Sequence, residues 1–184
     1  MCIRDSRVTD IYPSEPGLLQ SLFPFLTKLP RSLLPGRLKF IKDFSDTSKP
    51  VGAAFNNPSL ISQDGMEANT KQWRNAEIPA ANGHGTARSI AKLYGILANG
   101  GSRDGIHVLK PETIEMSRLP QSEGKDLVLG GMNTKFGLGF MLGNENISMG
   151  PNIKSFGHGG AGGSLGFCDP DNHVSLGFLS LIHI

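Results

Sequence analysis

One stretch near the C-terminal end restricts the folds open to this chain more than any other. Residues 156–164 read Phe-Gly-His-Gly-Gly-Ala-Gly-Gly-Ser, so five of nine positions are glycine and one is histidine. Glycine lets the backbone turn freely and lets another molecule approach the amides closely. Histidine adds a titratable group beside those amides. This composition leaves two interpretations open, a mobile glycine-rich loop and the wall of a binding site.

Segments typical of antiparallel strands surround this stretch. Large apolar residues alternate with glycine, or once with Met141, from Phe136 to Gly143, which predicts a strand. Residues 164–168 and 173–178 flank Asp-Pro-Asp-Asn at 169–172, where proline in second place suits a type I turn. The pattern predicts a hairpin. The glycine–histidine stretch then leads into a central strand, so we expect its amides at a sheet edge that a ligand can reach.

The clearest helix is predicted over residues 86–98. Thr86 can serve as its N-cap, and Gly100 or Gly101 can take the left-handed conformation that ends it. Three apolar residues at helical spacing form one stripe: Ile90, Leu93 and Leu97. A shorter helix is expected from Pro111 to about residue 119, because proline is favoured at the first helical position.

The N-terminal part is harder to interpret. Five prolines interrupt the apolar clusters of residues 7–50, which predicts only short helices with turns between them. Basic residues alternate with apolar ones there, and we interpret them as solvated helix faces rather than a membrane-surface segment. Residues 51–84 read as irregular, which leaves open a loop that lines a binding site and a surface connection.

The two ends of the chain match the translation of a sequencing adapter. Residues 1–6 can be encoded by ATG TGT ATA AGA GAC AG plus one base, and the reverse complement of that string encodes Leu-Ser-Leu-Ile-His-Ile, which is residues 179–184. We therefore set both ends aside, as one would a fusion scar. The native segment is expected to run from Arg7 to Phe178 as a fragment of a longer gene.

Composition excludes several classes of protein. The net charge is only +2 and the basic residues are dispersed, which argues against nucleic-acid binding. The histidines are too scattered for a zinc site, so no metal site is predicted. We expect His107 and His173 at the surface. Without Cys2 of the adapter, Cys168 is the one native cysteine, and it is expected to be a buried structural thiol that forms no intrachain disulfide.

Four segments, in chain order, resemble the C-terminal part of the serine β-lactamase-related family. They are Ala-Ala-Asn-Gly-His-Gly-Thr-Ala-Arg at 80–88, Ala-Asn-Gly-Gly at 98–101, Phe-Gly-Leu-Gly-Phe at 136–140, and the stretch at 156–164. The family includes class C β-lactamases, D-alanyl-D-alanine carboxypeptidases and family VIII esterases. The resemblance implies an α/β (α+β) fold, in which residues 85–178 supply a helix and an antiparallel sheet and residues 7–84 supply part of a helical or irregular subdomain.

The resemblance also implies roles for residues around the glycine–histidine stretch. The family places Ser-x-x-Lys, a Tyr-x-Asn-like box and Lys-Thr-Gly around one pocket, and His158 occupies the place of the third box. His158 would help hold the substrate's carboxylate or carbonyl, or tune the acid–base network. The backbone N–H of Ala161 would be one oxyanion donor. Gly159 and Gly160 would keep side chains out of the substrate's way.

Three more residues are candidates for substrate binding. Asn82 and His84 would face the pocket from the helical side, although a role in the entry into the helix at 86 is the favoured interpretation of His84. Trp73 would line the pocket for the acyl or leaving group, and the alternative is a core anchor.

The expected nucleophile is not found in this chain. Ser-x-x-Lys occurs at Ser89–Lys92 and Ser122–Lys125, but Ser89 lies inside a surface-type helix and Ser122 is expected in a polar loop. Neither tyrosine begins a Tyr-x-Asn box. The first two boxes are therefore expected upstream of residue 7.

The resemblance implies a serine hydrolase that opens an ester, a β-lactam or a peptide-like amide through an acyl-enzyme, with water as second substrate and no cofactor. Histidine in place of the lysine of the third box favours an esterase. The alternative is a catalytically inactive binding module with the same fold. The expected partner is a small-molecule substrate, with no nucleic acid and no membrane. Compartment, cytoplasmic or periplasmic, and oligomeric state are left open.

Overall fold

In the computed structural model the described residues are 25, 28–34, 39, 42–44, 46–56, 66–160 and 163–179. The chain divides into two compact units. One contains Pro79–Lys125 and the chain from Asn133 onward, and the other contains Asp10–Ile78 with Asp126–Met132. Each unit is described by itself, and the assignment of residues 7–84 to a helical subdomain stays a prediction.

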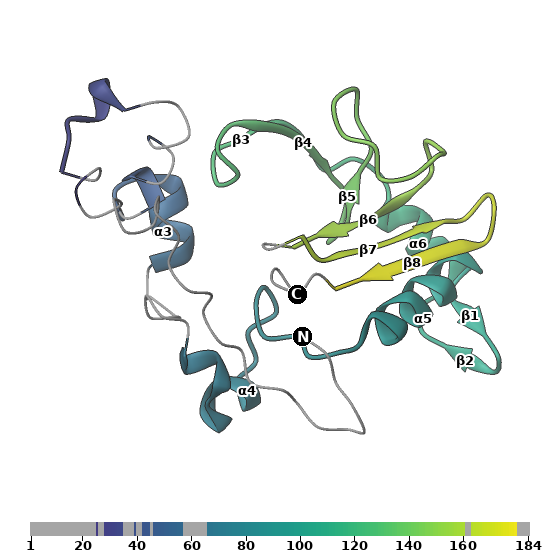
Figure 1. Cartoon of the computed structure of the whole chain (residues 1–184). Coiled ribbons are helices and arrows are strands. Elements are labelled where there is room, and N and C mark those ends of the chain that lie inside the picture. Colours follow the sequence, from purple (N-terminus) through teal and green to yellow (C-terminus); the bar gives the residue numbers. More distant parts are fainter. Residues whose placement is uncertain are drawn as a thin grey trace. The chain divides into compact units, whose positions relative to one another are not determined.

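The first unit is built on a six-stranded sheet in which neighbours in the chain are neighbours in space (Figure 1). The strands are β3 (Ser122–Asp126), β4 (Met132–Phe136), β5 (Met141–Leu142), β6 (Phe156–Gly159), β7 (Leu165–Asp169) and β8 (Val174–Phe178). All pairs from β4 to β8 are antiparallel. The predicted mixed α/β architecture with an antiparallel sheet is confirmed.

The predicted C-terminal hairpin is confirmed, with the first strand displaced by one residue and the second beginning one residue later. β7 and β8 pair with Asp169 opposite Val174 and Leu165 opposite Phe178. The Asp169 carboxylate organises the turn, because its Oδ1 accepts hydrogen bonds from the backbone N–H groups of Asp171 (3.1 Å) and Asn172 (3.3 Å). His173 closes the turn with φ of +53°.

The prediction of one strand from Phe136 to Gly143 is wrong. Phe136 ends β4 and pairs with Met141, the first residue of β5, so residues 137–140 form the turn of a hairpin. Gly137 N–H closes this turn on the Phe140 carbonyl at 2.9 Å, and Gly139 has φ of +78°. Glycine at alternate positions thus permitted a turn where the apolar alternation alone favoured a strand.

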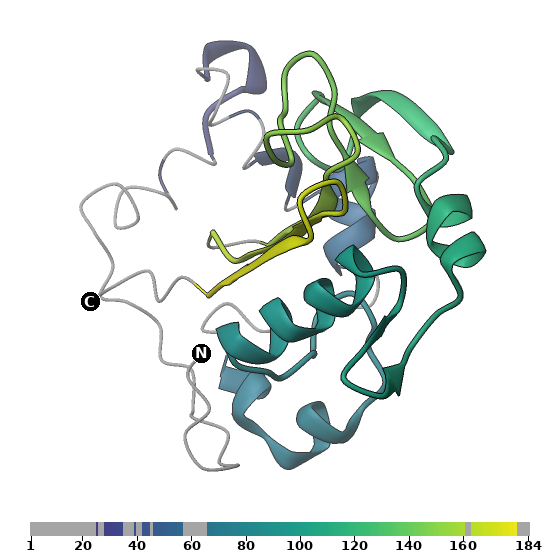
Figure 2. The same ribbon diagram turned by 90° about the vertical axis from the view of Figure 1, so that its right-hand side faces the viewer.

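The predicted helix is confirmed as α5 (Ala87–Ala98), which Figure 2 shows lying along the β7–β8 hairpin. Its C-terminus is a Schellman motif, because Gly100 N–H bonds the Leu97 carbonyl (3.2 Å) and Gly101 N–H bonds the Ile96 carbonyl (2.8 Å). The predicted stripe is wrong at Leu93, which is 48% exposed. Tyr94 takes its place against the core.

Two glycines let α5 approach the sheet closely. A Cβ on Gly166 would overlap the Tyr94 ring, and one on Gly177 would overlap the Ala87 carbonyl oxygen. Hydrogen bonds extend the contact, since Ser175 Oγ donates to the Ala91 carbonyl at 2.8 Å. The core beneath consists of buried residues from five elements: Leu97, Ala98, Ile114, Leu142, Phe156 and Cys168, with Tyr94 and Phe140 packed against them.

The N-cap of α5 offers a direct test of how local chemistry supports this contact. Thr86 Oγ1 accepts the Ser89 N–H at 3.0 Å, as predicted for the cap. We expect Thr86→Ala to lower the free energy of unfolding by about 1 kcal/mol, because the N–H loses its acceptor. Thr86→Ser retains the hydroxyl and should lower the free energy of unfolding by only a small fraction of that amount. Urea denaturation of the chain measures both, and equal losses would contradict the capping role.

The second predicted helix is α6 (Pro111–Ser117), with proline at its first position as expected. It follows a two-stranded hairpin of β1 (Ser102–Arg103) and β2 (Ile106–His107). His107 and His173 are exposed, as predicted. Cys168 is fully buried, and burial raises the pKa of its thiol to about 12, which keeps it protonated and unreactive at neutral pH.

The second unit contains short helices: η1 (Arg31–Leu33), α3 (Pro50–Asn56), η2 (Met66–Asn69) and α4 (Lys71–Asn75). The interpretation of residues 51–84 as irregular is therefore wrong in part. α4 begins because Thr70 Oγ1 accepts the Trp73 N–H at 3.2 Å. α3 packs through Phe55, whose ring stacks on Phe44 with centroids 5.0 Å apart. Most of the short helices expected over residues 7–50 lie outside the described residues.

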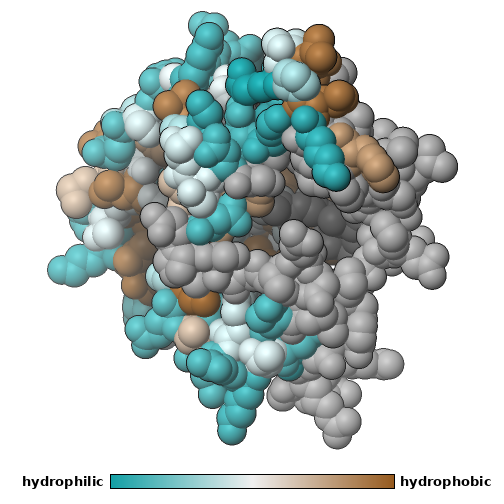
Figure 3. Space-filling model, turned by 90° about the vertical axis from the view of Figure 1, so that its left-hand side faces the viewer, coloured by the Kyte–Doolittle hydropathy of each residue, from teal (hydrophilic) through white to brown (hydrophobic). Residues whose placement is uncertain are grey.

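Large apolar side chains remain exposed on the first unit. Along β8, Val174, Leu176 and Phe178 alternate with the residues that face α5 and are 51%, 40% and 53% exposed. Figure 3 shows brown hydrophobic residues scattered among hydrophilic ones on one side of the molecule. Among the helices that the structure describes, none is long and apolar enough to cross a membrane.

Candidate active site

The site is built on β6, which its first two residues fix within the sheet. Phe156 is fully buried, its ring meets Phe140 edge-on at 4.9 Å, and the Arg118 guanidinium lies 5.4 Å above it. Gly157 lies between Met141 of β5 and Phe167 of β7, and a Cβ there would overlap the backbone of β7. The strand is thus anchored immediately before the histidine.

His158 is the first residue of β6 to emerge from the core. Its side chain is exposed, and its ring packs against that of Phe136 with centroids 5.9 Å apart and planes tilted by 36°. His158 Nδ1 lies 2.6 Å from the Gly159 carbonyl oxygen. Two contacts therefore hold the imidazole in one orientation while leaving it accessible.

The first glycine after His158 leaves open space at the end of β6. Gly159 has no left-handed φ, and a Cβ built on it would meet no atom within 4 Å. The fold itself therefore does not require glycine at 159. The loop closes where Gly160 N–H bonds the Ser164 carbonyl at 2.7 Å. Ala161 lies outside the described residues, and its N–H as an oxyanion donor stays a prediction.

The start of α5 lies at the same end of the sheet. His158 pairs with Gly166, Gly166 pairs with Gly177, and Gly177 contacts Ala87. α5 runs from there toward His173, whose Nδ1 lies 3.2 Å from the Ala98 carbonyl. The segment that enters α5 is therefore on the side where β6 ends.

Two of the predicted binding residues belong to that segment. Asn82 and His84 are half-buried and precede the N-cap residue Thr86. Trp73 belongs to α4 in the other unit. The structure thus brings His158, Gly159 and Gly160 together and places Asn82 and His84 at the same end of the unit. The pocket role of all six predicted side-chain and glycine positions stays a prediction.

Neither Ser-x-x-Lys match forms a nucleophile with its base. Ser89 Oγ is exposed and lies 2.8 Å from Thr86 Oγ1, within the helix cap. Ser122 lies in β3 rather than in the predicted loop. Three residues apart on a strand, Ser122 and Lys125 point to opposite faces of the sheet. The Lys-activated serine of an acyl-transfer enzyme needs its base within hydrogen-bond reach.

Phe136 is the residue of this site that sequence reasoning missed. It was expected to begin a strand of its own, and its position as the ring partner of His158 follows from the hairpin at 137–140, which sequence reasoning did not find. The described residues contain no group of three His, Cys, Asp or Glu side chains that could hold a metal ion.

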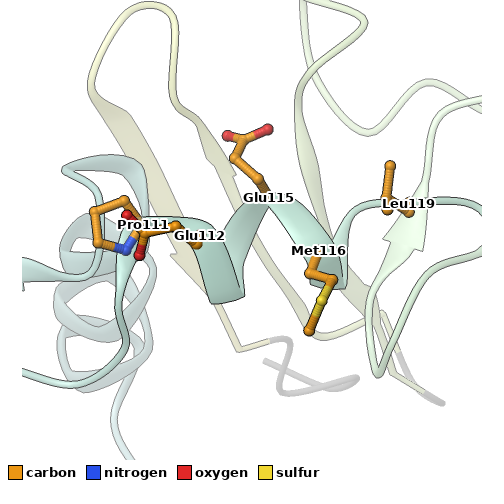
Figure 4. A pocket seen from close by; sticks show the side chains of 5 residues that line it. All are labelled: Pro111, Glu112, Glu115, Met116 and Leu119. Atoms are coloured by element: carbon orange, nitrogen blue, oxygen red, sulfur yellow. The ribbon is translucent and has the colours of Figure 1, made fainter.

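A separate open pocket lies along α6, away from these residues. Figure 4 shows its lining: Pro111, Glu112, Glu115, Met116 and Leu119. Glu115 is tied to Arg118 by an ion pair of 2.7 Å. The pocket offers neither a nucleophile nor a histidine, so the end of β6 remains the candidate site.

Comparison with protein families identifies the family of this chain. The model of the Beta-lactamase family matches residues 41–181, most of the chain. The chain belongs to the beta-lactamase family. This confirms the resemblance on which the sequence interpretation rested.

Individual proteins are similar to the chain over part of their length. The esterase/beta-lactamase LipL of Mycobacterium tuberculosis is 41% identical over 108 residues, which are 59% of this chain and 24% of LipL. A penicillin-binding protein homologue from Caulobacter crescentus matches with a TM-score of 0.60 and 40% identity, over 70% of this chain and 33% of its own.

Two further solved structures are similar to the chain. A family VIII carboxylesterase matches with a TM-score of 0.61 and 38% identity, over 69% of this chain and 33% of its own. EstA from Arthrobacter nitroguajacolicus Rue61a matches with a TM-score of 0.59 and 30% identity, over 72% of this chain and 35% of EstA. The chain therefore spans about a third or less of the length of these relatives.

Proposed function

We propose that this chain forms one wall of the active site of a serine hydrolase that cleaves esters through an acyl-enzyme. The observation that carries the proposal is the end of β6, where an exposed, oriented His158 stands beside glycine in the place of the family's third box. The clearance at Gly159, which packing does not require, supports a site that a substrate enters.

The nucleophile would come from the part of the enzyme that this chain does not span. The relatives are about three times as long as their matched portions, which leaves ample chain for a Ser-x-x-Lys helix. The names of two relatives, LipL and the family VIII carboxylesterase, include an esterase activity, which supports an ester as substrate.

The proposed reaction has two steps. The serine hydroxyl loses its proton to a neighbouring base, and its oxygen attacks the ester carbonyl. The alcohol leaves with that proton, and the acyl group stays on the serine. Water then attacks the acyl-enzyme, which releases the carboxylic acid and restores the serine. In the tetrahedral intermediates, the Ala161 N–H would stabilise the oxyanion, and losing one such donor typically costs about 2.7–4 kcal/mol.

Histidine in the third box favours esters over β-lactams. A lysine there carries a positive charge at neutral pH and pairs with a carboxylate such as that of a β-lactam. A neutral imidazole supplies no such charge.

The proposal predicts the substrate preference of the full-length enzyme. We expect rapid hydrolysis of p-nitrophenyl butyrate and little hydrolysis of nitrocefin, measured as kcat/KM for each. Efficient hydrolysis of nitrocefin with no action on the ester would sink the esterase assignment. Hydrolysis of neither would instead favour the binding module without catalysis.

A fluorophosphonate probe separates the nucleophile from the rest of the chain. The full-length enzyme should be labelled on one serine, and the 184-residue chain should remain unlabelled. Labelling of Ser89 in the 184-residue chain would overturn the assignment of that serine to the helix cap.

A further inference from the structure

The contact between His158 and Gly159 fixes which ring nitrogen carries the proton. A backbone carbonyl oxygen can only accept a hydrogen bond, so Nδ1, which lies 2.6 Å from it, must be the donor. In a neutral imidazole the other nitrogen is then unprotonated. Nε2 of His158 is therefore a hydrogen-bond acceptor.

This acceptor is accessible. The Phe136 ring packs against the imidazole and the Gly159 carbonyl holds Nδ1, while Nε2 makes no hydrogen bond to any residue that the structure describes. His158 is exposed at the end of β6. A molecule at the end of β6 thus meets an oriented acceptor.

We propose that His158 is a specificity-determining residue that selects uncharged substrates, or ones that present a hydrogen-bond donor, and disfavours substrates that present a carboxylate. The inference rests on the proposed function and goes beyond it. Carboxylate and carbonyl oxygens are both acceptors, so neither can bond to Nε2 in this tautomer. His158 would thus not hold the substrate's carboxylate or carbonyl.

Binding a carboxylate would require a change of the ring. Nε2 would have to gain a proton, either from solvent or by a tautomer exchange that breaks the contact with Gly159. A lysine in the same place would always supply donors and a positive charge. The difference between the two side chains should therefore appear as a difference in selectivity rather than in overall activity.

The experiment compares two esters of equal chain length in the full-length enzyme, p-nitrophenyl hexanoate and mono-p-nitrophenyl adipate. The wild-type enzyme should prefer hexanoate. His158→Lys should lower the hexanoate-to-adipate ratio of kcat/KM on the order of tenfold, since a charge-assisted hydrogen bond to the carboxylate replaces an acceptor. His107→Lys adds the same charge at another exposed histidine and should leave the ratio unchanged.

The tautomer is read independently by ¹⁵N NMR of the histidine-labelled enzyme at alkaline pH, with the His158 signal assigned from its loss in His158→Gln. A protonated Nδ1 and a bare Nε2 are expected. A protonated Nε2 in the neutral ring would overturn the inference whatever the activity, as would an unchanged ester ratio in His158→Lys. Failure of the proposed function looks different, because the wild-type enzyme would then turn over neither ester.

Discussion

Replacing Gly101 by alanine is expected to destabilise the first unit by about 2–5 kcal/mol, for two separate reasons. Gly101 has φ of +86°, a conformation that costs other residues roughly 1–2 kcal/mol. A Cβ there would also overlap the carbonyl oxygen of Leu109, which adds about 1–3 kcal/mol of overpacking. That carbonyl cannot move freely, since Val108 N–H is bonded to the Gly101 carbonyl at 2.9 Å.

Gly100 provides the matched control for this substitution. Its φ is also positive, +72°, but a Cβ would come no nearer than 3.8 Å to Pro111 Cγ. Gly100→Ala should therefore cost only the conformational part. Trp73, the single tryptophan, lies in the other unit, so hydrogen exchange of α5 and β8 peptides in urea is the appropriate measurement. Equal costs for the two variants would show that the close approach to Leu109 is unimportant.

The two helices and the last hairpin could be predicted because their signals are local. Thr86, Pro111 and the Asp-Pro-Asp-Asn turn act through neighbours in sequence, and each appears in the structure where it was expected. The break of the strand at Gly137 could not be predicted in the same way. Leu138 N–H donates to the Ser117 carbonyl at 2.8 Å, a contact with the end of α6 that no local pattern contains.

In the candidate site, too, the features that depend on local sequence could be predicted and those that depend on tertiary contacts could not. The glycine–histidine composition indicated His158 and an exposed end of a central strand, because glycine and histidine are unusual together within a sheet. The contacts that orient the ring were not predictable. Phe136 is 22 positions away in sequence, and it reaches His158 only because β4, β5 and β6 are adjacent in the sheet. The choice of tautomer depends on a single backbone carbonyl whose direction only the fold determines.

Asp169 is the charged residue whose loss should affect the first unit most. It is 1% exposed, and its Oδ2 accepts hydrogen bonds from the side-chain amides of Asn152 (2.5 Å) and Asn172 (2.9 Å). Its Oδ1 accepts two backbone N–H groups of the turn between β7 and β8. This one carboxylate thus ties the hairpin to the loop that leads into β6 and His158.

These bonds set the acid sensitivity of the hairpin. Burial alone would raise the pKa of the Asp169 carboxyl, but the hydrogen bonds from Asn172, Asn152 and the backbone outweigh it and hold the pKa below its usual range. Since the folded-state pKa is depressed, the stabilisation is fully present above the unfolded-state pKa of about 3.9. It should be lost as the pH falls below that value and through the folded-state pKa.

Asp169→Ala removes an acceptor from four donors at once. We expect the melting temperature at pH 7 to fall on the order of 10 °C, because the donors are left unpaired in a buried turn. The part of the acid sensitivity that comes from the Asp169 carboxylate should be absent in this variant. Asp171→Asn is the control in the same turn. Asp171 forms an exposed ion pair with Lys154 at 2.9 Å, and such pairs contribute little.

Calorimetry of the three proteins from pH 7 down to about pH 2, a range that passes below the unfolded-state pKa of Asp169, measures both effects. If the turn were held mainly by its net charge, both variants would shift the melting temperature alike. If Asp169 acts through its four bonds, only Asp169→Ala lowers it strongly at pH 7, and the wild type converges toward that variant as the carboxylate becomes protonated. The contrast between the two variants at pH 7 decides between net charge and the bonds of Asp169. The convergence would then show that the bonds depend on the ionised carboxylate, because protonation removes the charge from Oδ1 and Oδ2 without changing any other atom of the turn.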